Sequence, residues 1–490
     1  MSSVERYKAV DYQTGTPPRA FGSETEFTDN SNFVELYLAY LDSYHLIPER
    51  TNLMNVIEDS YVVSFNNYAN PYDVTTINGG RLYLDSETLE FATPECSSPK
   101  ELVLHERVGE RITYETLARA ALRLNELNLN VFKRSGYANV YSGNKILISE
   151  DSVGNHENYT SLNEFSALNF QTYAQIMKTY EDNKNAQHFA DFLALRKLID
   201  GVGMVDKAGY SITQRPRAVN YRDFSNMTRH GSKRPFFQHG DRMEVRSGEG
   251  NKSDWATEFK FGLTSLVLRL IEHDKFPAEL ALMDPTGDVI TLSRNPHGKV
   301  MMESGKLRPG ADVLKDIVNA AVDLGLSYPE FPKYEQKAAA DFYKFYDDLQ
   351  RVNLREHDVT ALADRIDWAA RYAYLVARGA TYETATSTNL DAVRDDLKWD
   401  QIGERDVARR YFSKFGHTAL NVSILGPPQT RAAARIRTAK QLAAKHNIHE
   451  IDWSNIISRD NIIYSFNNPL DPNGVTTIDV RTVGHPSDEE

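Results

Sequence analysis

Cysteine is almost missing from this sequence, since Cys96 is the single cysteine among 490 residues. One thiol excludes an internal disulfide framework and any zinc site built on a cysteine pair. The first residues, MSSVERYKAVDY, carry charges where a signal peptide needs an apolar run. We therefore expect a cytoplasmic protein in a reducing environment.

Long hydrophobic runs and a positive net charge are missing as well. The longest apolar stretch, around Leu263 to Ile271, is far shorter than the ~20 residues that cross a bilayer. The formal net charge of -12 argues against broad binding to nucleic acid or to anionic membranes. No Walker-type GxxxxGK(S/T) motif occurs, so a nucleotide would have to bind without a P-loop. We expect neither nucleic acid nor a membrane among the partners.

The residues that are present predict a mixed fold. Alternation of apolar and polar residues at 19–27 and 79–85, and the apolar run at 145–149, predict β-strands. Antiparallel strands with separate helices are typical of an α+β fold. Helical spacing predicts helices at 32–45, 99–127, 162–198, 254–272 and 428–446, the fourth with Ser253 as its N-cap.

Changes in composition along the chain predict two domains. After roughly residue 354 the pattern changes to short helices with loops, which places a boundary near 350–400. We expect a loose leader at 1–19, a large domain at 20–400, a small C-terminal domain at 401–483 and a tail at 484–490.

Two of the predicted strands collect carboxylates. Glu24 and Glu26 share one face of the first strand, because alternate residues of a strand point the same way. The second stretch carries Arg81, Tyr83, Asp85, Glu90 and Glu95. If the two acidic faces adjoin, unit charges ~4 Å apart repel by several kcal/mol at a protein-like dielectric. Mg²⁺ would offset this repulsion, because it takes carboxylate ligands together with substrate phosphates. Arg81 would then bind a phosphate group of the substrate. The alternative is a solvated outer sheet face.

The segment GNHENYT (154–160) contains His156 but lacks the second histidine of the zinc motif HExxH. Zinc is therefore not expected. A structural histidine in a loop is the simpler interpretation.

Two further segments are rich in basic residues. The segment 214–242 contains Arg215, Arg217, Arg222, Arg229, Lys233, Arg234 and Arg242. These side chains could neutralise a polyphosphate, and the alternative is a solvated basic surface. For the basic helix at 431–445 we favour simple solvation of its charged face.

Collinear motifs connect the sequence to a known family. NGGRLYLDSETLEFATPEC (78–96), GSETEF (22–27) and GNHENY (154–159) resemble the Pup ligase and depupylase family, which belongs with glutamine synthetase to the carboxylate-amine ligases. Further matches are ITQRPRAV (212–219), RPFF (234–237), IDWAARY (366–372), PPQTRAAARIR (427–437) and IDW (451–453). The resemblance implies a large domain with a curved antiparallel sheet that holds Mg-ATP. It also implies that the small C-terminal domain completes the nucleotide pocket.

The resemblance implies a role for each matching residue. The family's magnesium positions correspond to Glu24, Tyr83 and Glu90, with Glu26 beside them. Its ATP-contacting positions correspond to Arg81, Thr93 and Trp453, to which we add Arg242 and His156. Asp85 matches the catalytic aspartate. In the ligases ATP phosphorylates the γ-carboxylate of a C-terminal glutamate, and a base then deprotonates the attacking lysine amine.

Departures from the family pattern fall near the expected substrate. The acidic, histidine-containing segment that follows the RPFF strand is much shortened here. Glu244 and Glu249 stand where the family has a histidine and an aspartate. The family's roles can therefore be assigned more directly to the metal- and nucleotide-binding positions of this sequence than to the positions that recognise the substrate.

The favoured function is an ATP- and Mg²⁺-dependent ligase that forms an acyl phosphate and then joins the carboxylate to an amine on a protein. Its expected partners are ATP, a small protein modifier or other carboxylate substrate, and an amine-bearing protein or metabolite. Three alternatives stay open: a depupylase-like isopeptide amidohydrolase, a phosphotransferase that uses the same Mg-ATP site, and a non-catalytic scaffold.

Overall fold

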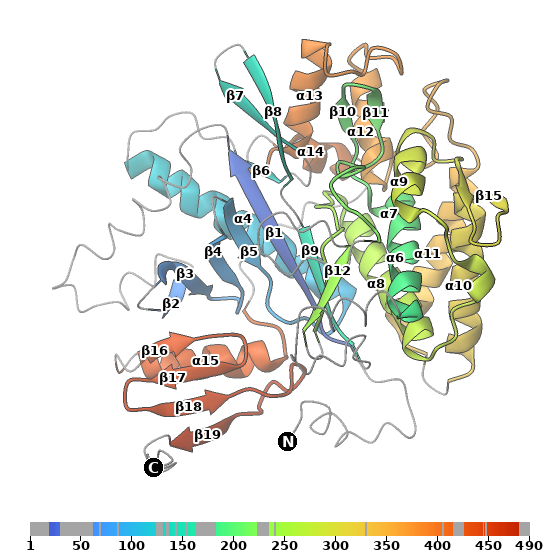
Figure 1. Ribbon diagram of the computed structural model, residues 1–490. Coiled ribbons are helices and arrows are strands. Elements are labelled where there is room, and N and C mark those ends of the chain that lie inside the picture. Colours follow the sequence, from blue (N-terminus) through green and yellow to red (C-terminus); the bar gives the residue numbers. More distant parts are fainter. Residues whose placement is uncertain are drawn as a thin grey trace, which may run out of the picture. The chain divides into compact units, whose positions relative to one another are not determined.

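The computed structural model divides into two units. It describes residues 19–29, 62–67, 70–85, 88–123, 131–133, 137–142, 145–152, 155–161, 183–222, 235–239, 242–328, 331–403, 406–414, 426–443, 445 and 448–479. Unit 1 comprises Met1–Phe21 with Lys133–Ala419, and unit 2 comprises Gly22–Phe132 with Leu420–Glu490. Both units contain helices and antiparallel strands, which confirms the α+β class (Figure 1). The domain boundaries expected from the sequence stay a prediction.

Unit 2 is built on an antiparallel sheet in the order β1-β5-β4-β3-β2-β16-β17-β18-β19. Its N-terminal elements are β1 (Phe21–Asp29), β2 (Val62–Asn67), β3 (Asn70–Thr76), β4 (Arg81–Asp85), β5 (Thr88–Ala92) and α4 (Pro99–Arg123), followed by β6 (Val131–Lys133), whose last residue is assigned to unit 1. Its C-terminal elements are α15 (Arg431–Ala443), β16 (Ile448–Ile451), β17 (Asn455–Ser458), β18 (Ile462–Ser465) and β19 (Thr476–Asp479). The two ends of the chain meet in one sheet because Glu450 of β16 pairs with Asn67 of β2.

Strand alternation gives this sheet one apolar face and one polar face. In β1, Phe27 is buried while its neighbours Glu24 and Glu26 are half-buried, as a strand packed on one side requires. Helix α4 packs against β5, where Gly109 leaves room for the ring of Phe91. The predicted strands at 19–27 and 79–85 and the helix from residue 99 are confirmed by β1, β4 and α4.

The C-terminal elements of unit 2 have a small core of their own. Helix α15 packs on β2, β16 and β17. The buried side chains of this core are Ala434, Ile436, Ala439, Leu442, Ile451, Ile456 and Phe466. Its helix confirms the one predicted at 428–446, with both ends shorter in the described residues.

Unit 1 is mainly helical. Its strands are β7 (Tyr137–Ser142), β8 (Lys145–Ser152), β9 (Asn155–Thr160), β10 (Met204–Asp206), β11 (Gly209–Ser211), β12 (Phe236–His239), β13 (Arg242–Val245), β14 (Lys299–Met301) and β15 (Leu307–Pro309). Its helices are α6 (Lys184–Leu195), α7 (Lys197–Asp200), α8 (Asp254–Glu272), η1 (Ala278–Leu280), α9 (Pro285–Arg294), α10 (Gly310–Leu326), α11 (Lys333–Leu349), α12 (Asp367–Val376), α13 (Leu390–Asp400) and α14 (Val407–Ser413). Strands β12, β13 and β9 are neighbours in one antiparallel sheet, and three two-stranded sheets pair β7 with β8, β10 with β11 and β14 with β15.

Helix α8 is the centre of unit 1. It packs against α6, α7, α10 and α11, which surround it in Figure 1. Its N-terminus is capped as predicted, because the Ser253 hydroxyl accepts a hydrogen bond from Ala256 N at 3.2 Å. Nearly all of its side chains are buried, so α8 is a core helix rather than a surface helix. Among the described residues, no helix is long and apolar enough to cross a membrane.

Several predictions from the sequence differ from the structure or fall outside it. The predicted helix at 32–45, residues 1–18 of the leader, the tail and residues 162–182 lie outside the described residues. Arg19 is not part of a loose leader, because it is buried and pairs with Glu272 at 2.8 Å. The loop predicted around His156 is wrong, because residues 155–160 form strand β9. The alternation of buried and half-buried residues in β9 does not show as alternation of apolar and polar residues, because one buried position is the charged residue Glu157.

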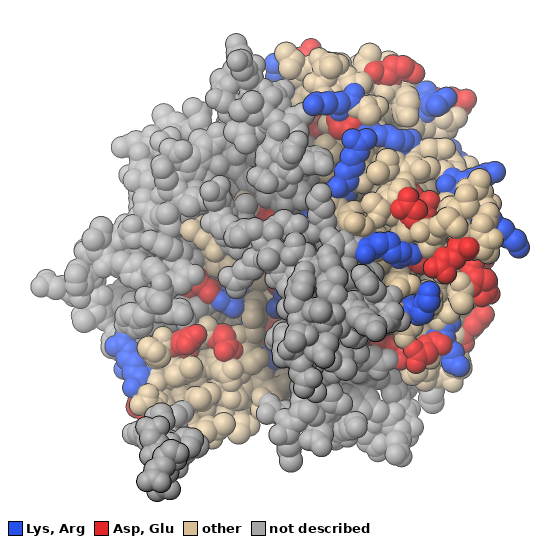
Figure 2. All heavy atoms as spheres, in the orientation of Figure 1, with Lys and Arg blue, Asp and Glu red and all other residues tan. Residues whose placement is uncertain are grey.

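Figure 2 shows how charge is distributed on one face. Over the described part of unit 1, blue basic and red acidic side chains are intermixed. Around α11, for example, Lys337 pairs with Asp341 at 2.7 Å and with Glu258 at 3.5 Å. Exposed pairs of this kind contribute little to stability.

Candidate functional site

The polar face of unit 2 brings together carboxylates from neighbouring strands. The antiparallel register places Glu26 of β1 opposite Glu90 of β5, and Glu90 opposite Tyr83 of β4. The next row contains Glu24, Ala92 and Arg81. Directly paired residues share a face, so the acidic faces expected from the sequence do adjoin, with β5 between β1 and β4.

Asp85 occupies the end of the same pattern. Its backbone pairs with that of Thr88, two positions along β4 from the pair of Tyr83 with Glu90. The face that strand alternation predicts for Asp85, shared with Arg81 and Tyr83, stays a prediction from the sequence.

Thr93 lies just beyond the end of β5. Its hydroxyl accepts a hydrogen bond from Ser23 N at 2.9 Å, and its own N–H donates to Ser23 O at 2.8 Å. With 4% exposure, its side chain extends the ladder between β1 and β5 by one residue.

The charges on this face act strongly on Tyr83. Burial, the negative charges of Glu90 and Glu24, and a hydrogen bond to Glu90 raise the pKa of the Tyr83 phenol well above its usual value. The phenol is therefore protonated at neutral pH and adds an oxygen donor atom without adding charge.

These donors fit a hard divalent cation. Glu26 and Glu90 stand directly opposite each other, and like charges in that arrangement destabilise a sheet. Glu90 is buried at 1% exposure and shares a hydrogen bond with Tyr83, so the two candidate ligands are already neighbours. Carboxylate oxygens with a phenol and water are a ligand set that suits Mg²⁺.

A cationic and aromatic cluster adjoins the acidic face. Arg81 donates from Nε to Asp73 Oδ1 at 3.2 Å and also pairs through Nη2 with that carboxylate. Its guanidinium carbon lies 5.6 Å from the ring centre of Tyr83 and 5.4 Å from that of Trp453. Two of the predicted ATP contacts, Arg81 and Trp453, are thus neighbours.

Two interpretations of charged residues near this cluster are wrong. Glu95 does not join the acidic face, because Arg431 and Arg435 of α15 bind its carboxylate at 2.6 and 3.0 Å. The basic face of α15 is not simply solvated, since Arg435 is 2% exposed. Burial alone would raise the pKa of Glu95, but the charges of Arg435 and Arg431 lower it to about 2.

In unit 1, the predicted residues His156 and Arg242 meet on Glu244. Arg242 donates to Asn158 Oδ1 at 2.7 Å and pairs with the Glu244 carboxylate. Glu244 also accepts from Arg246 Nε at 2.7 Å and lies 3.7 Å from His156 Nδ1. Arg242 and Arg246 therefore balance the negative charge of Glu244.

The basic segment 214–242 is largely committed to internal contacts where it is described. Arg215 is buried and donates to the carbonyl of Arg246 at 2.6 Å. Arg222 pairs with Asp191 at 2.7 Å. A solvated basic surface is therefore the wrong interpretation for these two residues, and 223–234 lie outside the described residues.

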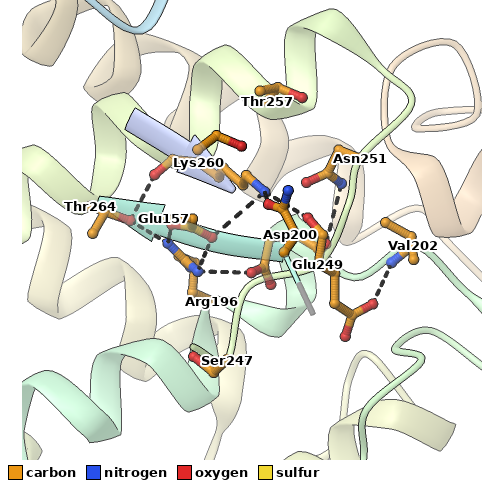
Figure 3. Close-up of polar contacts among 12 residues, drawn as sticks. Glu157, Arg196, Asp200, Val202, Ser247, Glu249, Asn251, Thr257, Lys260 and Thr264 are labelled. Atoms are coloured by element: carbon orange, nitrogen blue, oxygen red, sulfur yellow. Dashed lines mark hydrogen bonds and ion pairs between the residues drawn. The ribbon is translucent and has the colours of Figure 1, made fainter. Parts of the chain in front are cut away.

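The buried side of β9 is tied to the helices by charge (Figure 3). Arg196 donates to both carboxylate oxygens of Glu157 at 2.7 and 2.8 Å, and Lys260 lies 3.6 Å from Glu157. Burial would raise the pKa of Glu157, but these cations lower it to about 2. Asp200 accepts from Arg196 at 2.9 Å, so this buried cluster is extensively paired.

Glu249 belongs to the same buried cluster rather than to a substrate site. It is fully buried and accepts from Val202 N and Gln214 N, both at 3.0 Å. Sequence reasoning missed this cluster and Arg435. The signal for the cluster was the alternation within HENYT.

Known proteins resemble the chain over most of its length. A family model described as Pup-ligase protein matches residues 3–457. The chain belongs to the Pup-ligase family.

Members of the Pup-ligase family resemble the chain over most of its length. A Pup–protein ligase of Renibacterium salmoninarum is 26% identical over 474 residues, covering 90% of this chain and 92% of that protein. A crystal structure of the complex between prokaryotic ubiquitin-like protein Pup and its ligase PafA matches with a TM-score of 0.69 and 19% identity over 94% of this chain and 91% of that chain. A structure of the Pup ligase PafA in complex with ADP matches with a TM-score of 0.65 and 20% identity, covering 90% and 92%. The two structures show that the chain has the fold of Pup ligases.

Proposed function

We propose that the chain is an ATP- and Mg²⁺-dependent ligase that joins the carboxylate of a small Pup-like protein modifier to an amine of a target protein. Family membership over residues 3–457 supports this reaction class. The observation that carries it is the single polar face on which Glu24, Tyr83 and Glu90 occupy neighbouring rows, with Arg81 beside them.

Glu24, Glu90 and Tyr83 would hold Mg²⁺ in this proposal, with Glu26 in the same row as Glu90. Arg81, Trp453 and Thr93 would bind ATP, which the ADP complex of a Pup ligase supports. Bound Mg-ATP would supply the phosphoryl group that makes a carboxylate reactive toward an amine. The residues of the chain orient the phosphates, balance their charge and keep the carboxylate accessible to the amine.

Asp85 would act as the base. An amine must lose a proton to form an amide bond, and a carboxylate positioned near the reacting carbon can accept it. The register of β4 supports this role, because the backbone of Asp85 pairs with Thr88 only two positions along β4 from the pair of Tyr83 with Glu90. Arg242 and His156 would assist substrate phosphate or carboxylate binding in unit 1, where both contact Glu244.

The cysteine-poor composition supports a cytoplasmic location.

The test is conjugation by purified protein of a small modifier ending in glutamate to a lysine-bearing protein, with Mg²⁺ and ATP. Wild type should produce conjugate and one ADP per bond. Asp85→Asn keeps the shape and removes the charge, so turnover should fall about 10² to 10⁴-fold while Mg-ATP affinity stays within a few-fold.

The other outcomes of this experiment separate the alternatives. Release of modifier from a preformed conjugate without stoichiometric ATP use would identify an isopeptide hydrolase instead. Phosphate retained on a protein or small molecule without conjugation would identify a phosphotransferase. Full multiple-turnover activity in Asp85→Asn would exclude this residue as the base.

A further inference from the structure

Arg435 makes more directed contacts than an ordinary ion pair. It lies in α15, and 2% of its side chain is exposed. Nη1 donates to Glu95 Oε1 at 3.0 Å and to the Trp453 carbonyl at 2.7 Å. Nη2 donates to Glu95 Oε2 at 3.1 Å and to the Gly79 carbonyl at 2.9 Å. All four terminal N–H groups of the guanidinium therefore have an acceptor.

The three residues that accept these bonds border the proposed nucleotide residues in the sequence. Gly79 precedes Arg81 by two residues, and Glu95 follows Thr93 by two. The third acceptor is the backbone of Trp453 itself. One buried side chain thus links the three segments that supply the proposed ATP contacts.

Two cations lie near the ring of Trp453. The guanidinium carbon of Arg435 lies 5.0 Å from its ring centre, and that of Arg81 lies 5.4 Å from it. Asp73 in turn orients Arg81. Arg435 therefore fixes both the backbone and the ring of Trp453, which a purely local ion pair to Glu95 would not do.

Packing of the Gly79 turn against α15 supports the same assignment. Gly79 has a φ of 88°, in the region that favours glycine. A Cβ on Gly79 would lie 3.1 Å from Cβ of Ala432 and 3.4 Å from Cβ of Pro94. The turn that leads into β4 thus packs closely against α15, at the point where Arg435 donates to the Gly79 carbonyl.

We infer that Arg435 is a positioning residue of the nucleotide site, which holds Trp453 and the Gly79 turn so that Trp453 and Arg81 bind one ATP molecule. This inference rests on the proposed function, because it assumes that ATP binds here. Lysine cannot replace arginine in this role, because it has three donors on one nitrogen and cannot reach carboxylate and carbonyl acceptors in a planar fork.

The experiment measures ATP binding and steady-state kinetics for Arg435→Lys. KM for ATP should rise about tenfold, the scale expected for residues coupled by direct contact, while kcat at saturating ATP stays within about twofold. Arg437→Lys is the matched control, since Arg437 is an exposed arginine of the same helix that donates to the Pro472 carbonyl. It should leave KM and kcat unchanged.

A double variant distinguishes positioning from general stability. If Arg435 acts through Trp453, the rise in KM caused by Arg435→Lys should become much smaller when Trp453→Phe is already present. Equal rises in both backgrounds would show that Arg435 does not act through the indole ring of Trp453. Glu95→Gln is the second variant, in case Arg435→Lys fails to fold, and it should raise KM for ATP in the same direction.

Failure of the inference and failure of the proposed function give different results. If wild type does not bind Mg-ATP, the proposed function fails and this inference fails with it. If wild type binds Mg-ATP but folded Arg435→Lys has an unchanged KM and merely melts at a lower temperature, Arg435 is structural and the proposed function stands.

Discussion

At the scale of single residues, the turn before the site is supported by a buried histidine. Asn78 accepts from the Thr76 hydroxyl at 2.6 Å and from Gly80 N at 3.2 Å through its Oδ1. Its Nδ2 can only donate and lies 3.4 Å from Nδ1 of His105. Nδ1 can accept this bond only while the imidazole is neutral.

Protein stability should therefore depend on pH through His105. Burial lowers the pKa of His105 from 6.5 to about 4. As the pH falls below 6.5, His105 binds a proton in the unfolded chain, but in the folded chain it does so only near pH 4. The free energy of unfolding therefore has its full value above pH 6.5 and decreases as the pH falls from 6.5 to about 4. The loss should amount to about 3 kcal/mol. Urea unfolding at several pH values measures it.

The control for this prediction is His105→Gln, which cannot titrate. Its free energy of unfolding should change less between pH 6.5 and 4 than that of wild type. Equal slopes in the two proteins over this range would assign the pH dependence to other groups.

At the scale of elements, the contact of α4 with β5 determines how the site face is supported. Phe91 lies between Glu90 and Ala92, with its ring on the opposite face of the sheet, against Gly109 of α4. The helix can approach β5 this closely because Gly109 has no side chain.

Gly109→Ala should destabilise the protein although alanine is the better helix former. The helix would gain up to about 1 kcal/mol, but the new Cβ would overlap the Phe91 ring, and such overpacking costs about 1–3 kcal/mol. We expect a lower melting temperature by calorimetry. Adding Phe91→Leu should restore part of the loss, whereas no recovery would point to helix distortion rather than to the Phe91 contact.

At the scale of the whole molecule, the site face is assembled from distant parts of the sequence. Glu24, Glu90 and Trp453 come from the two ends of the chain, and all lie in unit 2. Binding at this face should therefore stabilise the folded chain as a whole.

Mg²⁺ and ATP should raise the melting temperature together. The carboxylates need the metal and the metal needs phosphate oxygens, so either alone should act weakly. At a ligand concentration 100 times Kd, the gain is about 2.7 kcal/mol. Differential scanning fluorimetry measures it with each component alone and with both.

Glu24→Ala and Glu90→Ala should abolish this shift. Glu115→Ala is the control, because Glu115 lies on α4 and pairs with Arg111 away from the acidic face. An equal shift from ATP in the presence of EDTA would show that magnesium has no part in binding.

Local periodicity predicted much of this protein. Alternation in β1 and β4 predicted which carboxylates share a face, and Ser253 predicted the start of α8. Strand alternation and helix capping depend only on residues that are close in the sequence. The same local pattern therefore gives the same local structure in any protein. The motifs also identified the family from positions 22 to 453, as the match over residues 3–457 confirms.

Only the tertiary structure decided how charges pair. From sequence alone Glu95 looked like another site acid, His156 like a loop residue and Arg435 like a solvated charge, but each assignment depended on a partner far away in the chain. The pairing of Glu95 with Arg435 connects segments that only folding brings within 3.0 Å. The environment of a charge depends on burial and on distance in space, and neither is encoded in the local sequence period.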